Sequence, residues 1–225
     1  MISAMRSRWP TKRILIGKTD LDAAYRRIHA HTNTASTCIA IVDELAFLCL
    51  RLPFGTTPAP AEYRTISEAA IDLGNELLQD QSWDTNDLNS PHRSLIPTEE
   101  KQKSASHLEK ADPLAVDITA TEASMDGFID DTITITVDDD HWIDCAKSAA
   151  LLVIHTLFRP LQPSEPLKRD DLLSLRKLAG EGQLAEQKTC LGWDINTQYL
   201  RVSLPEEKQT AWTNDIKEAL ASTKI

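Results

Sequence analysis

Several features that would identify other classes of protein are missing from this chain of 225 residues. No apolar run approaches the roughly 20 residues that a helix needs to cross a bilayer, and the first residues lack the apolar core of a secretory signal. The four cysteines are widely spread, without the C-x-x-C pairs of zinc or redox sites. Seven glycines give no sign of a low-complexity polymer. We therefore expect a soluble intracellular protein, cytoplasmic or nuclear, with no membrane contact.

Basic residues are also scarce, since 24 Lys and Arg face 34 Asp and Glu, for a net charge of −10. Nucleic-acid binders normally present a basic surface, so the total charge argues against one. The distribution is uneven, however, because the first 30 residues carry seven Lys and Arg against two Asp. Residues 111–146 hold ten Asp and Glu and no Lys or Arg. Such an acidic region concentrates metal cations and repels phosphates that arrive without them.

The apolar patterns predict an α+β fold, with an antiparallel sheet backed by helices. Strands are expected over 12–19, 37–42, 46–52, 124–129, 132–137, 188–195 and 200–204. Helices are expected over 61–79, 141–158, 172–178 and from Pro205 to about Ser222, with a short helical turn over 22–28. Residues 80–121 are polar and without period, so they are expected to form a long loop or insertion.

Three aspartates stand at the ends of predicted strands. Asp20 closes the apolar run that starts at Ile14, and the pair Asp130-Asp131 lies in a turn before alternating Ile and Thr. Adjacent carboxylates repel each other unless a cation lies between them. If the strand ends meet, Asp20, Asp130 and Asp131 form a site for divalent metals and phosphates.

With these residues in place, the chain resembles the palm of a reverse transcriptase, an RNA-directed DNA polymerase of the retrotransposon type. The segment Lys18-Thr19-Asp20-Leu21-Asp22-Ala23-Ala24-Tyr25 looks like motif A, and Leu52-Pro53-Phe54-Gly55 looks like motif B. Phe128-Ile129-Asp130-Asp131 looks like the aromatic-x-Asp-Asp box of motif C. Leu191-Gly192-Trp193 looks like the primer-grip hairpin, and Leu204-Pro205-Glu206 like the start of a thumb. Each motif is weak alone, but four in the expected order are specific.

The resemblance implies a polymerase palm with partial fingers and the start of a thumb. Residues 1–79 would hold partial fingers and palm with motifs A and B, and 80–121 would be an insertion. Residues 122–204 would complete the palm with motif C and the primer grip, and 205–225 would begin the thumb. The expected chain is a fragment of a retrotransposon polyprotein, with other segments of that polyprotein as further partners.

The implied reaction adds deoxynucleotides to a DNA primer on an RNA or DNA template by two-metal phosphoryl transfer. Asp20, Asp130 and Asp131 would be the catalytic residues and would hold Mg²⁺ or Mn²⁺. The substrate-binding residues implied by the resemblance are Leu21, Asp22, Tyr25, Phe54, Gly55 and Lys177. Tyr25 would exclude a sugar 2′-hydroxyl, and Gly55 would let the backbone approach the nucleotide. Lys177 or Lys188 would protonate the leaving pyrophosphate.

Other interpretations stay open at this stage. Asp22 suits an N-cap better than a ligand, and Tyr63 and Trp193 suit packing better than base stacking. His92 and His107 stand without partners at ligand spacing, so no metal role is expected for them. Two other functions remain: a catalytically inactive palm remnant, and an unrelated acidic metal-binding or interaction domain built on residues 126–144.

Overall fold

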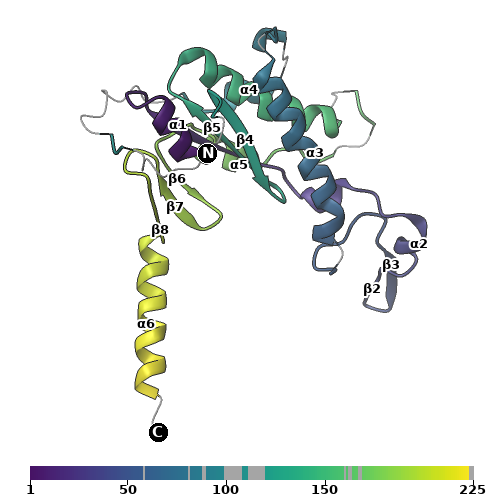
Figure 1. Cartoon of the computed structure of the whole chain (residues 1–225). Helices are drawn as coiled ribbons and strands as arrows, with labels where there is room; N and C mark the ends of the chain where they lie inside the picture. Colours follow the sequence, from purple (N-terminus) through teal and green to yellow (C-terminus); the bar gives the residue numbers. More distant parts are fainter. Residues whose placement is uncertain are drawn as a thin grey trace.

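The computed structural model describes residues 1–57, 59–80, 82–87, 90–98, 108–110, 120–159, 161, 164–166 and 169–222. The described chain is an α+β protein with three small antiparallel sheets and six α-helices (Figure 1). His107, for which no metal role is expected from the sequence, lies outside the described residues. No helix among the described residues combines the length and apolarity needed to span a membrane.

The central sheet has the strand order β1-β5-β4, formed by β1 (Ile14–Asp20), β5 (Asp131–Val137) and β4 (Ala123–Phe128). Both pairings are antiparallel, with Ile14 opposite Val137 at one end and Asp20 opposite Asp131 at the other. Because alternate side chains point to opposite faces, Gly17, Thr134 and Met125 share one face, and Lys18, Asp20 and Asp131 share the other.

Two long helices, α3 (Ala59–Gln79) and α4 (Asp140–Leu157), cover the first of these faces (Figure 1). Met125 and Leu78 are buried there with Ala149 of α4. A second cluster joins Leu21 and Tyr63 to Ile154, so that the segment after β1 packs against the same two helices. Burial of this apolar surface is the main stabilising contribution to the sheet.

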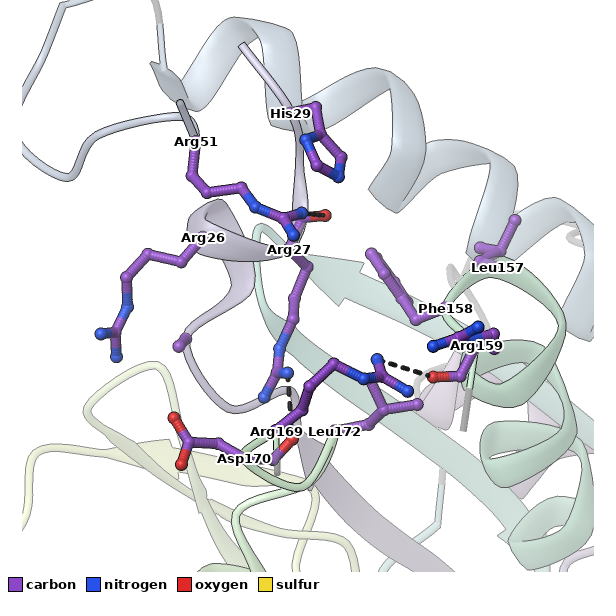
Figure 2. A pocket seen from close by; sticks show the side chains of 11 residues that line it. Arg26, Arg27, His29, Arg51, Leu157, Phe158, Arg159, Arg169, Asp170 and Leu172 are labelled. Atoms are coloured by element: carbon purple, nitrogen blue, oxygen red, sulfur yellow. Dashed lines mark hydrogen bonds between the residues drawn. The ribbon is translucent and has the colours of Figure 1, made fainter. Parts of the chain in front are cut away.

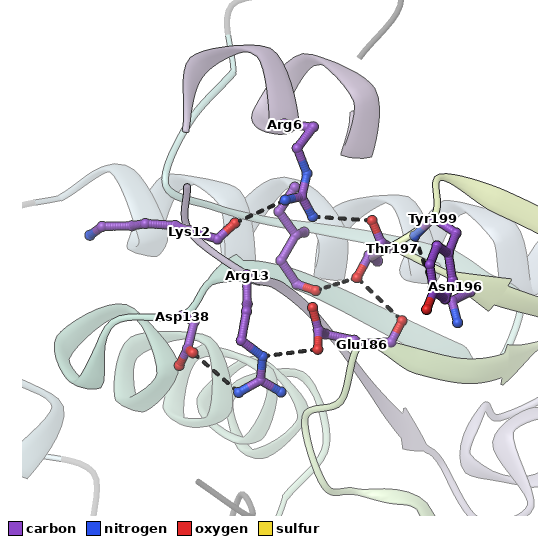
Figure 3. A network of polar contacts seen from close by, with 9 residues as sticks. Arg6, Lys12, Arg13, Asp138, Glu186, Asn196, Thr197 and Tyr199 are labelled. Atoms are coloured by element: carbon purple, nitrogen blue, oxygen red, sulfur yellow. Dashed lines mark hydrogen bonds and ion pairs between the residues drawn. The ribbon is translucent and has the colours of Figure 1, made fainter. Parts of the chain in front are cut away.

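A buried polar network joins the start of β1 to the N-terminal helix and to the segment around Glu186 and Thr197 (Figure 3). Arg6 of α1 (Ile2–Arg8) is only 1% exposed and donates to the carbonyl oxygens of Lys12 and Thr197, at 3.3 and 3.1 Å. The Thr197 hydroxyl donates to the carbonyl of Ile14 at 2.6 Å. Arg13 pairs with Glu186 at 2.9 Å and with Asp138 at 3.3 Å. These bonds attach α1 and the C-terminal sheet to β1.

The C-terminal sheet has the order β6-β7-β8, with β6 (Gln187–Cys190), β7 (Trp193–Asn196) and β8 (Arg201–Ser203). It is preceded by α5 (Leu175–Glu181), which packs against β1, and followed by α6 (Glu206–Ser222). Helix α6 projects away from the body and buries none of its residues (Figure 1).

A second projection lies beyond one end of α3 and consists of α2 (Thr32–Ala35), β2 (Ile39–Val42) and β3 (Leu45–Leu48) (Figure 1). Every residue of these two strands is exposed. The remaining elements are the 3₁₀ helices η1 (Ala24–Arg27), η2 (Thr85–Asp87) and η3 (Pro91–Leu95).

Several sequence-based expectations are wrong in detail. The strand expected over 188–195 is interrupted at Leu191 and Gly192, whose φ angles of 51° and 80° form a two-residue turn between β6 and β7. The helix expected from residue 172 begins at Leu175, because Leu173 pairs with Leu21 instead. The strand expected to reach residue 52 ends at Leu48.

The insertion over 80–121 is structured in its described part. Arg93 donates to the carbonyl of Thr85 at 2.8 Å, and both side chains bond the Asp144 carboxylate of α4. Because the periodic signal is absent from so short a 3₁₀ segment, sequence patterns cannot identify this attachment.

Candidate active site

Three carboxylates gather where the central sheet ends. Asp20 is the last residue of β1 and lies opposite Asp131, the first residue of β5. Asp130 occupies the turn that joins β4 to β5, and its carbonyl accepts a bond from Leu21 N at 3.3 Å. Residues directly opposite in an antiparallel pair present their side chains to the same face. The sheet therefore brings the motif A aspartate and the motif C pair to one end.

The turn that carries Asp130 has an unusual backbone. Ile129 has a φ angle of 58°, in the left-handed region that β-branched residues rarely adopt. Such conformations persist only where the surrounding structure enforces them, and they concentrate at functional sites. Here the flanking Phe128–Asp131 pair and the packing of Ile129 against the core around Tyr63 fix the turn.

Each strand-end carboxylate contacts a lysine. Lys177 Nζ of α5 donates to Asp20 Oδ1 at 2.8 Å, and Lys18 Nζ lies 3.1 Å from Asp131 Oδ1. The hydrogen bond to Asp20, helped by the charges of Asp131 and Asp130, raises the pKa of Lys177. Lys177 is therefore a protonated amine held at the carboxylates. Sequence reasoning missed Lys18, although its position two residues before Asp20 on a strand places it on the same face.

The other lysine considered for the same role lines a hollow together with Asp131 but bonds to other partners. Lys188 Nζ donates to the carbonyls of Glu181 and Gln183 near the end of α5, and burial lowers its pKa. Among the described residues, Lys188 forms no hydrogen bond or ion pair with Asp20, Asp130 or Asp131. Of the two lysines, Lys177 is the one that the structure brings to the carboxylates.

Among the described residues, no lysine forms an ion pair with Asp130, although the nearby charge of Lys177 partly opposes the rise of its pKa. Its carboxyl is half-buried, and burial raises its pKa, with further contributions from the negative charges of Asp131 and Asp20. The charge of Asp130 in turn helps to raise the pKa of Tyr25 and of Tyr63, after burial as the first cause. A carboxylate that lies among other carboxylates and is partly removed from water gains most from a bound cation.

Motifs A and B meet beside these carboxylates through aromatic contacts. The ring of Tyr25 lies between those of Phe54 and Tyr63, with centroid distances of 5.7 and 5.3 Å and edge-to-face geometry. Tyr63 is buried, whereas Phe54 is 86% exposed. Gly55 has a φ of 88° that favours glycine, and apart from its chain neighbours no atom of the described residues lies within 4 Å of the position of a Cβ. The Tyr25 ring thus packs against the buried Tyr63, whereas Phe54 and Gly55 lie in a loop that is exposed to solvent.

The remaining motif A residues serve the fold. Leu21 is 5% exposed in the core, and Asp22 N donates to the carbonyl of Leu172 at 2.9 Å. The expectation that Asp22 caps the following helix is wrong, because η1 begins after Ala23 and has no side-chain cap. The Asp22 carboxylate lies 3.6 Å from Arg27 instead. The left-handed φ of 53° at Ala23 separates Asp22 from the helical turn that it was expected to cap.

Leu191 and Gly192 of the segment Leu191-Gly192-Trp193 share a pocket with Asp131. A hollow of about 470 Å³ is lined by Lys18 and Asp131 and by Leu191 and Gly192, among others. Lys208 of α6 donates to the carbonyl of Gly192 at 3.4 Å. Trp193 pairs with Cys190 across the hairpin and is 47% exposed. The hairpin tip therefore faces Asp131, while Trp193 lies on the hairpin surface.

Carboxylate oxygens are the ligands that Mg²⁺ and Mn²⁺ prefer, so the donor types at this sheet end fit those ions. Within the part of the chain that the structure describes, no three His, Cys, Asp or Glu side chains converge closely enough to hold a metal ion. The two lysine amines are the cations that contact Asp20 and Asp131 instead. A metal at this site would compete with them.

A histidine pair behind the site was not foreseen from the sequence. His92 Nδ1 lies 3.2 Å from His155 Nε2, and His92 Nε2 lies 2.9 Å from Asp171 Oδ1. Asp171 precedes Leu172 and Leu173, which pair with the segment after Asp20. The pair therefore joins the insertion, α4 and the backbone next to Asp20. No sequence signal marks it, because the three residues are far apart along the chain.

Comparisons with known proteins give a limited result. No family model matches the chain, and no curated protein matches it. Among solved structures, the chain is similar to the foamy viral protease-reverse transcriptase, whose structure was solved in complex with dsDNA. The TM-score is 0.46 at 14% sequence identity, over 89% of this chain and 28% of that one. The chain thus spans less than a third of the length of that protein.

Proposed function

We propose that this chain is the palm of a reverse-transcriptase-like polymerase, which adds deoxynucleotides to a DNA primer on an RNA or DNA template. The register of the central sheet carries the proposal. It pairs Asp20 with Asp131 and leaves Asp130 in the adjoining turn, so that carboxylates from motifs A and C share one sheet end. Asp20, Asp130 and Asp131 would hold Mg²⁺ or Mn²⁺, which supplies positive charge to the phosphoryl oxygens when bound.

The neighbouring side chains have roles that fit this chemistry. Lys177, protonated beside Asp20, would give a proton to the leaving pyrophosphate. Tyr25, braced by Tyr63, would bound the sugar and exclude a 2′-hydroxyl, next to Phe54 and Gly55. The hollow between Asp131 and the Leu191-Gly192 turn would receive the primer end. Each role depends on proximity and orientation set by the sheet.

The test is primer extension on an RNA template with Mg²⁺ and deoxynucleotides, comparing the wild type with Asp130→Asn. The variant keeps the side-chain volume and removes the charge, so extension should fall to background. Asp126→Asn is the matched control, because Asp126 is an exposed aspartate on the same hairpin. Full extension by Asp130→Asn would overturn the assignment of the site.

A catalytically inactive palm is a second candidate, and the two lysine pairs favour it. Lys18 and Lys177 already neutralise Asp131 and Asp20, and a metal must displace both amines. Calorimetric titration of the wild type with Mn²⁺ separates the candidates. Binding that is lost in Asp20→Asn supports the polymerase proposal, and no binding in the wild type supports the inactive palm. Binding that is unchanged in Asp20→Asn supports instead an unrelated acidic metal site within 126–144.

A further inference from the structure

A second pocket includes residues of the segment that follows Asp20. It has a volume of about 540 Å³ and is formed by η1, the end of α4 and the strand-like segments around residues 29, 51 and 170 (Figure 2). Its described lining includes five arginines, which are Arg26, Arg27, Arg51, Arg159 and Arg169. His29 is a further lining residue, and Asp170 is the one acidic residue of the described lining.

Some of these arginines have carboxylate partners. Arg159 and Arg169 share Glu165, at 3.2 and 2.6 Å. Arg27 lies 3.6 Å from the Asp22 carboxylate. Three arginines are therefore balanced by two carboxylates.

Two arginines are not balanced in this way. Arg51 donates to the carbonyl of Arg27 at 3.3 Å, and neither Arg51 nor Arg26 pairs with a carboxylate of the described residues. Both side chains are exposed. Asp170 forms no ion pair with an arginine among the described residues. It is the acidic side chain of the described lining that can offset the charges of Arg26 and Arg51. The pocket thus carries excess positive charge in a chain whose net charge is −10.

Part of the pocket is fixed before any ligand arrives. Arg27 Nε donates to the carbonyl of Asp22 at 2.9 Å, and its other nitrogens donate to the carbonyls of Asp170 and Asp171. Figure 2 shows the guanidinium of Arg27 near the middle of the labelled side chains, with Arg26 to its left, Arg51 above it and Arg169 to its right. Guanidinium groups stay charged at all physiological pH values and bond phosphate oxygens with two parallel N–H groups.

We propose that this pocket binds a compact polyphosphate anion, either free or as the phosphate tail of a nucleotide. Guanidinium groups that gather around one hollow suit a small group with several charges. The site needs no divalent cation and none of the strand-end carboxylates, so it does not depend on the proposed polymerase activity.

The test is calorimetric titration of the full chain with inorganic tripolyphosphate in EDTA at low salt. Arg51→Ala and Arg26→Ala should each weaken binding about tenfold, the usual consequence of losing one charged hydrogen-bond donor. Arg201→Ala is the matched control, since Arg201 is an exposed arginine on β8 with no ion pair among the described residues. It should change the affinity less than about twofold.

A parallel titration with dATP in EDTA separates the two sources of the phosphates. Tighter binding of dATP than of tripolyphosphate identifies a nucleotide tail, and the reverse order identifies free polyphosphate. Either order supports the pocket if the two arginine variants weaken it. Absence of binding in the wild type, or equal weakening by Arg201→Ala, overturns the proposal. Asp130→Asn should keep tripolyphosphate binding even where primer extension is lost.

Discussion

The central sheet and the β2–β3 hairpin are built from similar residues but have opposite surroundings. Ile14, Leu15 and Ile16 of β1 are at most 1% exposed, whereas Ile41 and Phe47 of the hairpin are 76% and 51% exposed. The sheet is covered by α3, α4 and α1, and the hairpin pairs only with itself among the described elements. Apolar alternation in the sequence therefore identifies a strand but does not show whether other elements cover it. The difference in burial also explains why the carboxylates stand on the sheet, where packing fixes their backbone.

The difference in burial between the two regions is tested most directly by truncating one apolar residue in each. Leu15→Ala removes a side chain buried with Ile143 and Leu184, and we expect a loss of about 2–5 kcal/mol in the free energy of unfolding. Ile41→Ala should cost less than about 0.5 kcal/mol, because the side chain is in water. Urea denaturation measures both. Similar losses from the two variants would mean that the hairpin is covered in solution.

The buried network at the start of β1 predicts the next largest effect. Thr197→Val keeps the shape of the side chain but removes the hydroxyl that donates to the Ile14 carbonyl. A buried acceptor without a partner costs about 1–3 kcal/mol. Thr197→Ser, which keeps the hydroxyl, should recover much of this in the same denaturation experiment. Destabilisation by Ser with no destabilisation by Val would assign the stabilising effect of Thr197 to packing of its methyl group.

Removing the charge of one of the carboxylates is expected to increase the stability of the fold by a smaller amount. The fold raises the pKa of Asp130 through burial and two neighbouring carboxylates, so its charge opposes folding at neutral pH. Asp130→Asn should therefore raise the melting temperature by on the order of 2 °C while it removes metal binding. Asp126→Asn should leave the melting temperature unchanged in calorimetry. A lower melting temperature for Asp130→Asn would show that the charge stabilises the turn.

The smallest effect concerns pH and the histidine pair. Burial, and then the neighbouring His92, lower the pKa of His155 from the usual 6.5, against a smaller opposing effect of Asp171. As the pH falls below about 6.5, the unfolded chain binds a proton that folded His155 resists, so stability decreases. The contribution is complete above that pH. Chemical denaturation at several pH values should show a decrease that is weaker in His155→Gln and unchanged in His29→Gln, which alters an exposed histidine.

Much of the site was accessible from the sequence because its residues stand at strand ends. The runs that end at Asp20 and begin after Asp130 have the alternation of strands, and their pairing follows from burial of one face. The helices over 59–79 and 140–157 begin within two residues of the predicted positions. The Leu191-Gly192 turn was missed because the apolar residues on both sides suggest one continuous strand.

What the sequence determined by itself is most of the strands, the long helices and the identity of the three carboxylates, since these depend on local periodicity and turn residues. The short helices α1 and α2 were not predicted. Only the tertiary structure decided their partners. Lys177 reaches Asp20 from α5, Lys18 contacts Asp131 across the sheet, and His92 meets His155 from the insertion. The arginine pocket likewise combines four separate segments. Charge pairing acts over a few ångströms in space, and residues far apart in sequence come within that range only when the chain has folded.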